Sequence, residues 1–164
     1  MRNDERMESN LDESVSSANI FNRILVAVDG SNSARKAAIL AVRLAKRNAS
    51  ELIVATVAPP PRYVSSSRRD LEHLLSGYDA TRSKEMEKWV SDIVSMAKSH
   101  GVDAMGHVRK SSSVVRSITE LGEQLGVDLI VLGTRGQSGI KTLLLRSVSK
   151  DVVSHAPCSV LVVR

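Results

Sequence analysis

Five short apolar runs divide the chain into alternating segments of two kinds. The runs are built from Val, Ile, Leu and Ala with few polar interruptions, which is typical of parallel strands buried on both faces. They occupy residues 23–29, 51–58, 103–109, 128–132 and 157–163. The run at 103–109 is the weakest, because Gly106 and His107 dilute it, and it is expected nearer an edge of the sheet. Between them, apolar residues recur every three or four positions, as in helices that cover a sheet. The alternation of the two patterns predicts an α/β fold with an open, mostly parallel sheet.

The helical segments differ in how clearly they begin. Ser31 or Ser33 is expected to cap the first helix, and one of the serines at 111–113 the third, because a serine hydroxyl accepts from the exposed N–H groups of a first turn. The second helix is predicted over residues 77–100, since residues 59–77 begin with three prolines and offer little to bury. The predicted buried stripes are Ala37, Ala38, Ala41, Val42 and Ala45 in the first helix and Met86, Trp89, Val90, Ile93, Val94 and Ala97 in the second.

Composition narrows the class of protein. Apolar residues make up 42% of the 164 residues but aromatic residues only 2%, so the core must be aliphatic and the bases of a single-stranded nucleic acid would find almost no stacking partners. The net charge of +5 is moderate, and no apolar run is long enough to span a membrane. Cys158 is the single cysteine, which fits a reducing cytoplasm and favours a small apolar core residue over a nucleophile. Residues 1–20 are polar and predict a disordered N-terminal extension to one domain, residues 21–164.

The fourth apolar run leads into the segment with the most distinctive chemistry. Gly133-Thr-Arg-Gly136 follows it, and the stretch from Gly133 to Lys150 contains four cations and no carboxylate. Glycines let backbone N–H groups approach an anion, and open parallel sheets bind ligands beyond the carboxyl ends of their strands. Asp29 follows the first strand at the same rim, where a carboxylate suits ribose hydroxyls or a metal ion. The alternative is ordinary turn chemistry for Asp29 and for both glycines.

Familiar catalytic fingerprints are absent from the sequence. It contains neither a Walker phosphate loop nor a G-x-G-x-x-G motif, and Gly136-Gln-Ser-Gly-Ile140 misses the nucleophile-elbow pattern at its last position. The histidines are scattered singly and no group of residues has metal-ligand spacing, so surface or helix-end positions are expected for His73, His100, His107 and His155. The sequence therefore gives positive indications of binding and none of catalysis.

Three segments taken together resemble the universal stress protein family. They are Ile24-Leu-Val-Ala-Val-Asp-Gly-Ser31, Asp128-Leu-Ile-Val-Leu-Gly-Thr-Arg-Gly136 and the C-terminal segment Ser147–Arg164. The resemblance extends over essentially all of residues 23–164. It implies a Rossmann-like, five-stranded sheet of order 3-2-1-4-5 with helices on both faces. It also implies a homodimer formed through the last strand, Ser159–Val163.

The resemblance further implies an adenine-nucleotide site at the carboxyl edge of the sheet. The ATP-binding branch of the family carries G-x-x-G, nine residues, then G-[ST], and Gly133, Gly136 and Ser147 match three of these positions. Adenine and ribose contacts would fall on Ala27, Asp29 and Val57, and the contacts of the phosphate loop on Gly133, Arg135, Gly136, Arg146, Ser147, Val148 and Ser149. The ligand would be ATP or AMP, and Mg²⁺ could accompany it and reach Asp29.

One motif position departs from the family pattern, because Arg146 stands where the third glycine belongs. A left-handed backbone there would cost an arginine about 1–2 kcal/mol, whereas its guanidinium could instead bind a phosphate with two charged hydrogen bonds. Both outcomes are compatible with the sequence.

The sequence is compatible with three functions. The leading one is a cytoplasmic, nucleotide-binding stress or signalling module with slow or absent hydrolysis. The second is a dimeric interaction protein that binds no nucleotide and uses the basic segment with Arg62, Arg68 and Arg69 together with the edge of the last strand. The third, an adenine-nucleotide enzyme such as a ligase or transferase, lacks a catalytic constellation.

Overall fold

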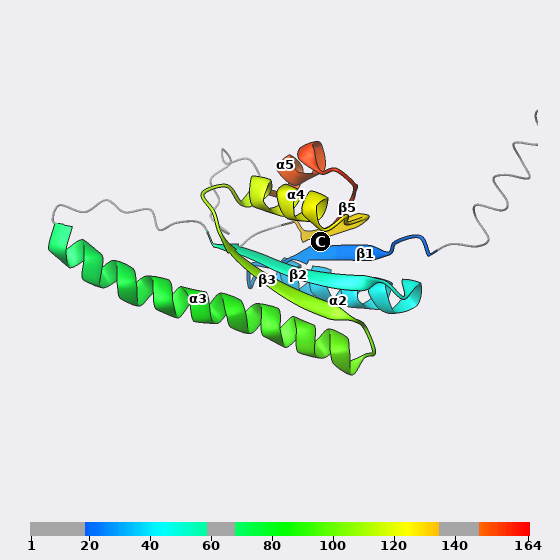
Figure 1. The fold of residues 1–164 in the computed structure, drawn as a ribbon, viewed down its shortest axis with the longest axis horizontal. Helices are drawn as coiled ribbons and strands as arrows, with labels where there is room; N and C mark the ends of the chain where they lie inside the picture. Colours follow the sequence, from blue (N-terminus) through cyan, green and yellow to red (C-terminus); the bar gives the residue numbers. More distant parts are fainter. Residues whose placement is uncertain (1–18, 59–67, 135–147) are drawn as a thin grey trace, which may run out of the picture.

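The five apolar runs form one parallel sheet, as predicted. The computed structural model describes residues 19–58, 68–134 and 148–164, with only the backbone described for residues 68–80. The strand order is β3-β2-β1-β4-β5 (Figure 1), which confirms the predicted 3-2-1-4-5 arrangement. The elements are β1 (Arg23–Ala27), α2 (Asn32–Asn48), β2 (Glu51–Ala58), α3 (Arg68–Ser99), β3 (Ala104–Lys110), α4 (Val114–Gln124), β4 (Leu129–Gly133), α5 (Val148–His155) and β5 (Ser159–Val163).

The helices form a layer on each face of the sheet. In Figure 1, α2 and α3 lie on one face and α4 and α5 on the other. The chain moves outward from β1 to β3 and then returns across the sheet to β4. Because successive parallel crossovers share one handedness, this reversal of direction requires the later helices to cover the opposite face.

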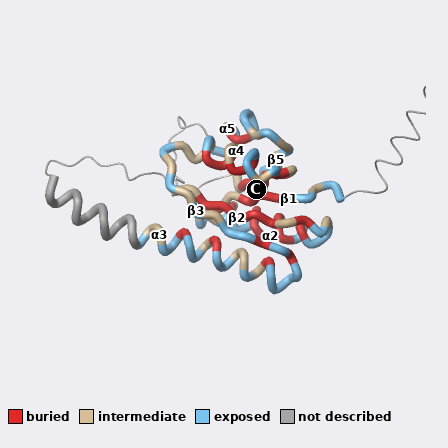
Figure 2. Tube along the Cα trace, in the orientation of Figure 1, coloured by how far each residue is buried: buried red, intermediate tan, exposed pale blue. Residues whose placement is uncertain are grey.

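Each face of the sheet has its own aliphatic core. Buried residues concentrate along the strands and the inner sides of the helices (Figure 2). The core on the α2–α3 face contains Ile24, Val26, Val28, Leu52, Val54, Leu129 and Val131, together with the alanines of α2. The core on the α4–α5 face contains Leu25, Ile53, Ala55, Ile118, Leu121, Ile130, Leu132 and Val152. Alternate residues of each strand thus point to opposite cores, which explains the unbroken apolar runs.

The helix caps and the edge strand agree with the sequence. Ser31 caps α2 by accepting from the N–H of Ala34 at 3.2 Å, and Ser113 caps α4 by accepting from the N–H of Arg116 at 3.3 Å. The run at 103–109, expected near an edge, forms the edge strand β3. No helix among the described residues is long and apolar enough to cross a membrane.

The predicted start of the second helix was wrong. Helix α3 begins at Arg68 rather than near Gly77, and the chain is helical through most of the predicted 59–77 loop. No proline occurs after Pro61 in that segment, and one glycine inside a helix costs only about 1 kcal/mol, which a 32-residue helix can absorb. The rest of the predicted loop, residues 59–67, lies outside the described residues.

A cluster of polar contacts joins the strands at their amino ends. The Oδ2 atom of Asp128 accepts from the backbone N–H groups of Asn22 at 2.6 Å and of Arg23 at 2.9 Å. The side chain of Arg23 donates to the Glu51 carboxylate at 2.9 Å and to the carbonyl of Leu125 at 2.8 Å. These bonds connect β1 to the start of β2 and to the segment that enters β4. We call this group the amino-edge clasp.

Candidate functional site

The sheet has one topological switch point, at the carboxyl ends of β1 and β4. Strand β1 pairs with β2 on one side and with β4 on the other, so that Ala27 lies opposite Ala55 and Val26 opposite Val131. The strand order reverses between β1 and β4, and such reversals open the crevice in which α/β proteins bind ligands. The predicted site residues Ala27, Asp29 and Gly133 follow or end these two strands.

An apolar floor lies on the α4 side of this crevice. Ala27 and Val57 are partly buried and pack against the core of the α4–α5 face. Val114 and Val115, from the first turn of α4, pack against the same core. The backbone N–H of Ser111 donates to the carbonyl of Ala58 at 2.9 Å, which holds the entry to α4 beside the end of β2. Val114 and Val115 were not among the residues that the sequence predicted for this edge, although the start of α4 after β3 lies there.

Asp29 organises the turn between β1 and α2. Its Oδ1 atom accepts from the N–H of Ser31 at 3.0 Å, and the hydroxyl oxygens of Ser31 and Ser33 lie 3.2 Å apart. Asp29 is only partly buried, so part of its side chain stays accessible at the carboxyl end of β1. Asp29 therefore stabilises the turn, as the alternative interpretation of its sequence position predicted, and the same hydrogen bond orients the carboxylate without burying it.

Trp89 of α3 lies over the same turn. Gly30 adopts φ +80°, and a Cβ at this position would collide with the indole ring of Trp89. A glycine is thus required both by the backbone conformation and by the close approach of the ring. The sequence assigned Trp89 to the buried stripe of its helix, but its side chain is half-buried and lies over Gly30, the residue that follows Asp29.

Gly133 allows the first turn of α2 to contact the end of β4. A Cβ on Gly133 would lie 2.6 Å from the carbonyl carbon of Ser33 and 2.7 Å from the backbone nitrogen of Ala34. No side chain fits at that distance, so the glycine is a packing requirement even in the absence of a ligand. The contact brings the N-terminal N–H groups of α2 to the crevice, where they and the helix dipole favour an anion.

Strand β4, which pairs with β1 at the switch point, precedes α5 in the chain. The N–H of Thr134 donates to the carbonyl of Val163 at 2.8 Å, so β4 stays paired with β5 until the loop begins. Val148 and Ser149 start α5, the former 41% exposed and the latter half-buried. The structure thus places Ala27, Asp29, Val57, Gly133, Val148 and Ser149 along the carboxyl edge. The predicted contacts Arg135, Gly136, Arg146 and Ser147 lie outside the described residues.

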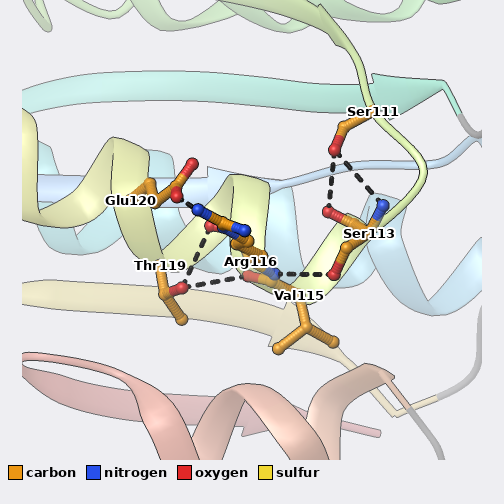
Figure 3. Close-up of polar contacts among 6 residues, drawn as sticks. All are labelled: Ser111, Ser113, Val115, Arg116, Thr119 and Glu120. Carbon is orange, nitrogen blue, oxygen red and sulfur yellow. Dashed lines mark hydrogen bonds and ion pairs between the residues drawn. The ribbon is translucent and has the colours of Figure 1, made fainter.

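The entry to α4 is held by its own polar contacts (Figure 3). The Ser111 hydroxyl donates to the carbonyl of Ser113 and accepts from its N–H, both at 3.2 Å. Arg116 donates to the Glu120 carboxylate at 2.7 Å, and this hydrogen bond and the charge of Glu120 raise the pKa of the guanidinium. A shallow groove of about 360 Å³ between α4 and α5 is lined by Ser113, Val115, Arg116, Thr119, Asp151 and His155. Arg116, which lines this groove, is thus paired with a carboxylate of its own helix.

Residues suited to catalysis do not gather in the described part of the chain. No group of three or more His, Cys, Asp or Glu side chains there could hold a metal ion. Cys158 is half-buried rather than fully buried, and its burial, followed by the charge of Asp128, raises the pKa of the thiol. His100 and His155 are exposed at helix ends, as predicted, whereas His107 lies within β3, and its buried Nε2 atom has no hydrogen-bond partner among the described residues.

Comparison with other sequences agrees with the architecture. One continuous match to the universal stress protein family extends over residues 21–164. The universal stress protein YxiE of Bacillus subtilis is 34% identical over 149 residues, covering 88% of this chain and 100% of that protein. The putative universal stress protein SH1215 of Staphylococcus haemolyticus is 33% identical over 144 residues, covering 88% of this chain and 85% of that protein.

Solved structures share the fold along most of the chain. The universal stress protein UspA from Lactobacillus plantarum superposes with a TM-score of 0.77 at 24% identity, covering 91% of this chain and 100% of that chain. A universal stress protein in complex with cAMP gives a TM-score of 0.66 at 25% identity over 90% of this chain and 98% of that chain. The universal stress protein from Archaeoglobus fulgidus in complex with dAMP superposes with a TM-score of 0.61 at 20% identity, covering 88% of this chain and 99% of that chain. From its strand order, its sequence match and these relatives, the chain belongs to the universal stress protein family.

Proposed function

We propose that this universal stress protein binds an adenine nucleotide at the crevice between Asp29 and the segment that begins at Gly133. The observation that carries the proposal is the contact of Gly133 with the first turn of α2, where a Cβ would lie only 2.6 Å from the Ser33 carbonyl carbon. This contact brings helix N–H donors to a strand-order reversal, beside an apolar floor. Solved neighbours of the same fold hold cAMP and dAMP, which supports an adenine ligand.

Each described residue would have a separate role toward the nucleotide. Ala27 and Val57 offer a flat aliphatic surface on which an adenine ring can lie, and the nearby valines of α4 extend it. Asp29 would accept hydrogen bonds from the ribose hydroxyls, and the hydrogen bond from the Ser31 N–H to its Oδ1 atom supports this role by orienting the carboxylate. The first turn of α2, together with Val148 and Ser149 at the start of α5, would surround the phosphates.

The remaining phosphate contacts would come from Arg135, Gly136, Arg146 and Ser147. We expect Arg146 to approach the phosphate with its guanidinium, which would make ATP bind more tightly than AMP. Mg²⁺ would reach the site with the ATP phosphates and could contact Asp29. The spacing of motifs in the sequence assembles no set of nucleophile, base and orienting residue, so we expect slow hydrolysis at most and a stress or signalling role in the cytoplasm.

A second candidate function is a dimeric interaction protein without nucleotide. The feature that favours it is Arg146, which replaces a motif glycine and would obstruct a backbone that must pass close to a phosphate. Both candidates include a homodimer through the edge strand β5, Ser159–Val163. Its position at the edge of the sheet leaves one side for pairing, and Val162 is 36% exposed.

Titration calorimetry with ATP and with AMP tests the proposal, and Trp89 provides a second readout. Trp89 is the only tryptophan and lies over Gly30, beside Asp29, so nucleotide binding should change its fluorescence. Asp29→Ala should weaken binding about tenfold or more, since it removes a charged hydrogen-bond acceptor. Asp103→Ala is the matched control, because Asp103 is exposed at the amino edge and should leave affinity unchanged. If neither nucleotide produces heat or a fluorescence change at millimolar concentration, the interaction protein is the better description.

A further inference from the structure

Helix α2 presents an outer face with charge of only one sign. Its 17 residues contain five cations and no carboxylate. All five cations are exposed: Arg35, Lys36, Arg43, Lys46 and Arg47. They surround Ile39, an apolar side chain that is itself 46% exposed. We call this surface the cationic face of α2.

The cationic face has no counter-charges among the described residues. The described ion pairs join Arg23 to Glu51, Lys88 to Asp92 and Arg116 to Glu120, and none of them includes a residue of α2. Helix α3 covers the same face of the sheet but alternates lysines with carboxylates over residues 84–92. Arg43 and Arg47 lie one turn apart on α2, a spacing at which like charges repel. Within the part of the chain that the structure describes, this concentration of charge therefore forms no ion pair.

The opposite charge occurs in the same chain, before the family domain. Residues 1–18 carry five carboxylates and two arginines: Asp4, Glu5, Glu8, Asp12 and Glu13 against Arg2 and Arg6. The chain's net +5 thus separates into −3 for residues 1–18 and +8 for the remainder. The family match begins only at residue 21. The acidic segment is consequently an addition to the domain that carries the cationic face.

The point where this segment joins the domain lies beside α2. The carbonyl of Phe21 accepts from the hydroxyl of Ser50 at 2.5 Å, and Ser50 follows α2 by two residues. Phe21 also packs against the core on the α2 side of the sheet. The first cations of α2 that the segment would meet are therefore Lys46 and Arg47, in its last turn.

The acidic segment is long enough to cover the whole face. Eighteen residues of extended chain span up to about 60 Å, whereas the 17 residues of α2 extend about 25 Å. A segment that starts at Lys46 and Arg47 can therefore reach Arg35 and Lys36 at the other end of the helix with slack remaining.

We infer that residues 1–18 dock on the cationic face of α2 of their own chain and cover it through electrostatic attraction. The attraction between exposed charges falls steeply with salt, because the screening length shrinks from about 10 Å at 0.1 M to about 3 Å at 1 M. The docked segment is thus a displaceable cover, which a more highly charged polyanion can replace. The inference does not depend on nucleotide binding.

Zero-length carbodiimide crosslinking of the full chain, followed by mass spectrometry, tests the inference. The reagent joins a carboxylate to a lysine amine only when they are in salt-bridge contact, and residues 1–18 contain no lysine of their own. At low salt we expect peptides that join residues 1–18 to Lys36 and Lys46, and we expect their loss at 1 M salt. Crosslinks spread evenly over Lys84, Lys98 and the other exposed lysines, or no crosslinks from the segment, would overturn the inference.

Two further arms separate the possible occupants. Arg43→Glu with Arg47→Glu keeps both reporter lysines but removes the attraction, so the crosslinks should disappear, whereas the control Lys84→Glu with Lys98→Glu on α3 should retain them. In a mixture of isotopically labelled and unlabelled protein, links within one chain support the inference, and links only between chains show instead that a second copy provides the segment.

Neutralising the five carboxylates of residues 1–18 should strengthen retention of the protein on a heparin column, because the uncovered cationic face can then bind the polyanion. Unchanged retention would show that the face is not covered.

Discussion

The two ends of the same sheet are built in opposite ways. At the amino end, polar side chains are committed to protein partners, and the Asp128 carboxylate alone accepts two backbone N–H groups within 2.9 Å. At the carboxyl end, the side-chain hydrogen bonds of Asp29 and Ser31 stay within one turn, and glycines allow close contacts between elements, with Gly133 against α2 and Gly30 under Trp89. The amino-edge clasp therefore holds strands together, whereas the carboxyl edge brings helix starts and apolar surface to a common crevice.

Chain direction explains this difference. In a parallel sheet every strand delivers its helix from the same edge, so the N-termini of α2, α4 and α5 meet at the carboxyl ends of the strands. Their N–H groups favour anions, while the amino edge receives helix C-termini and needs cations and local hydrogen bonds. Arg23, which donates to the carbonyl of Leu125 at the end of α4, has that second role. Changes at the amino edge should consequently affect stability alone, and changes at the carboxyl edge should also affect binding.

The largest effect is expected from Gly133→Ala. The new methyl group would collide with the backbone of Ser33 and Ala34, so α2 must shift away from β4. We expect a loss of about 3 kcal/mol in the free energy of unfolding, as for overpacked cores, together with weaker nucleotide binding. Urea denaturation and calorimetry measure the two effects.

Gly122→Ala is the control for this substitution. It also adds a methyl group to a buried glycine, but the nearest atom would be the flexible end of Ile130 at 3.3 Å, and alanine favours the helix. Its change in stability should be within about 1 kcal/mol, without an effect on affinity. Equal losses in both variants would contradict a specific role for the contact between Gly133 and α2.

Asp128→Ala should have the next largest effect, at the opposite edge. It removes the acceptor of the Asn22 and Arg23 N–H groups, which are exposed enough for water to replace part of the loss. We expect about 1–2 kcal/mol of destabilisation with unchanged nucleotide affinity. Urea denaturation measures the loss of stability, and titration calorimetry measures the nucleotide affinity. A loss of affinity comparable to that of Asp29→Ala would mean that the two edges are not functionally separate.

A smaller, stabilising effect is expected from Ala49→Gly at the end of α2. Ala49 is exposed, caps the helix in the left-handed region with φ 50° and donates its N–H to the Ala45 carbonyl. Glycine removes a conformational cost of about 1–2 kcal/mol but loses more entropy on folding, so the net gain should be about 0.5–1 kcal/mol. Thermal unfolding measures it. Ala49→Val, with a branched side chain in the same conformation, should lower stability instead.

Much of the fold was predictable from local patterns, and much of the site was not. The strands follow from uninterrupted apolar runs, and the position of β3 at an edge follows from Gly106 and His107 within a weak run. The predicted start of α3 was too late, because the prolines at 59–61 restrict only their own backbone and that of the residue before each, and residues from Arg68 onward are free to form a helix. The packing requirement for glycine at position 133 could not be predicted from the sequence, since it depends on how closely α2 approaches β4 in three dimensions.

The smallest effect concerns Cys158, at the entry to β5 on the amino edge. Burial, and then the negative charge of Asp128, raises the pKa of its thiol, so the folded protein retains this proton more tightly than the unfolded chain. The corresponding stability is fully present below the unfolded pKa of about 8.5 and is lost as the pH rises through the higher folded pKa. Urea denaturation above pH 8.5 should therefore show a steeper fall in stability for the native sequence than for Cys158→Ala. Nucleotide affinity should follow the same pH dependence in both proteins, because the thiol is remote from the carboxyl edge. If the two denaturation profiles run parallel, the thiol titrates alike in the folded and unfolded chains, and the amino edge contributes no pH dependence through this residue.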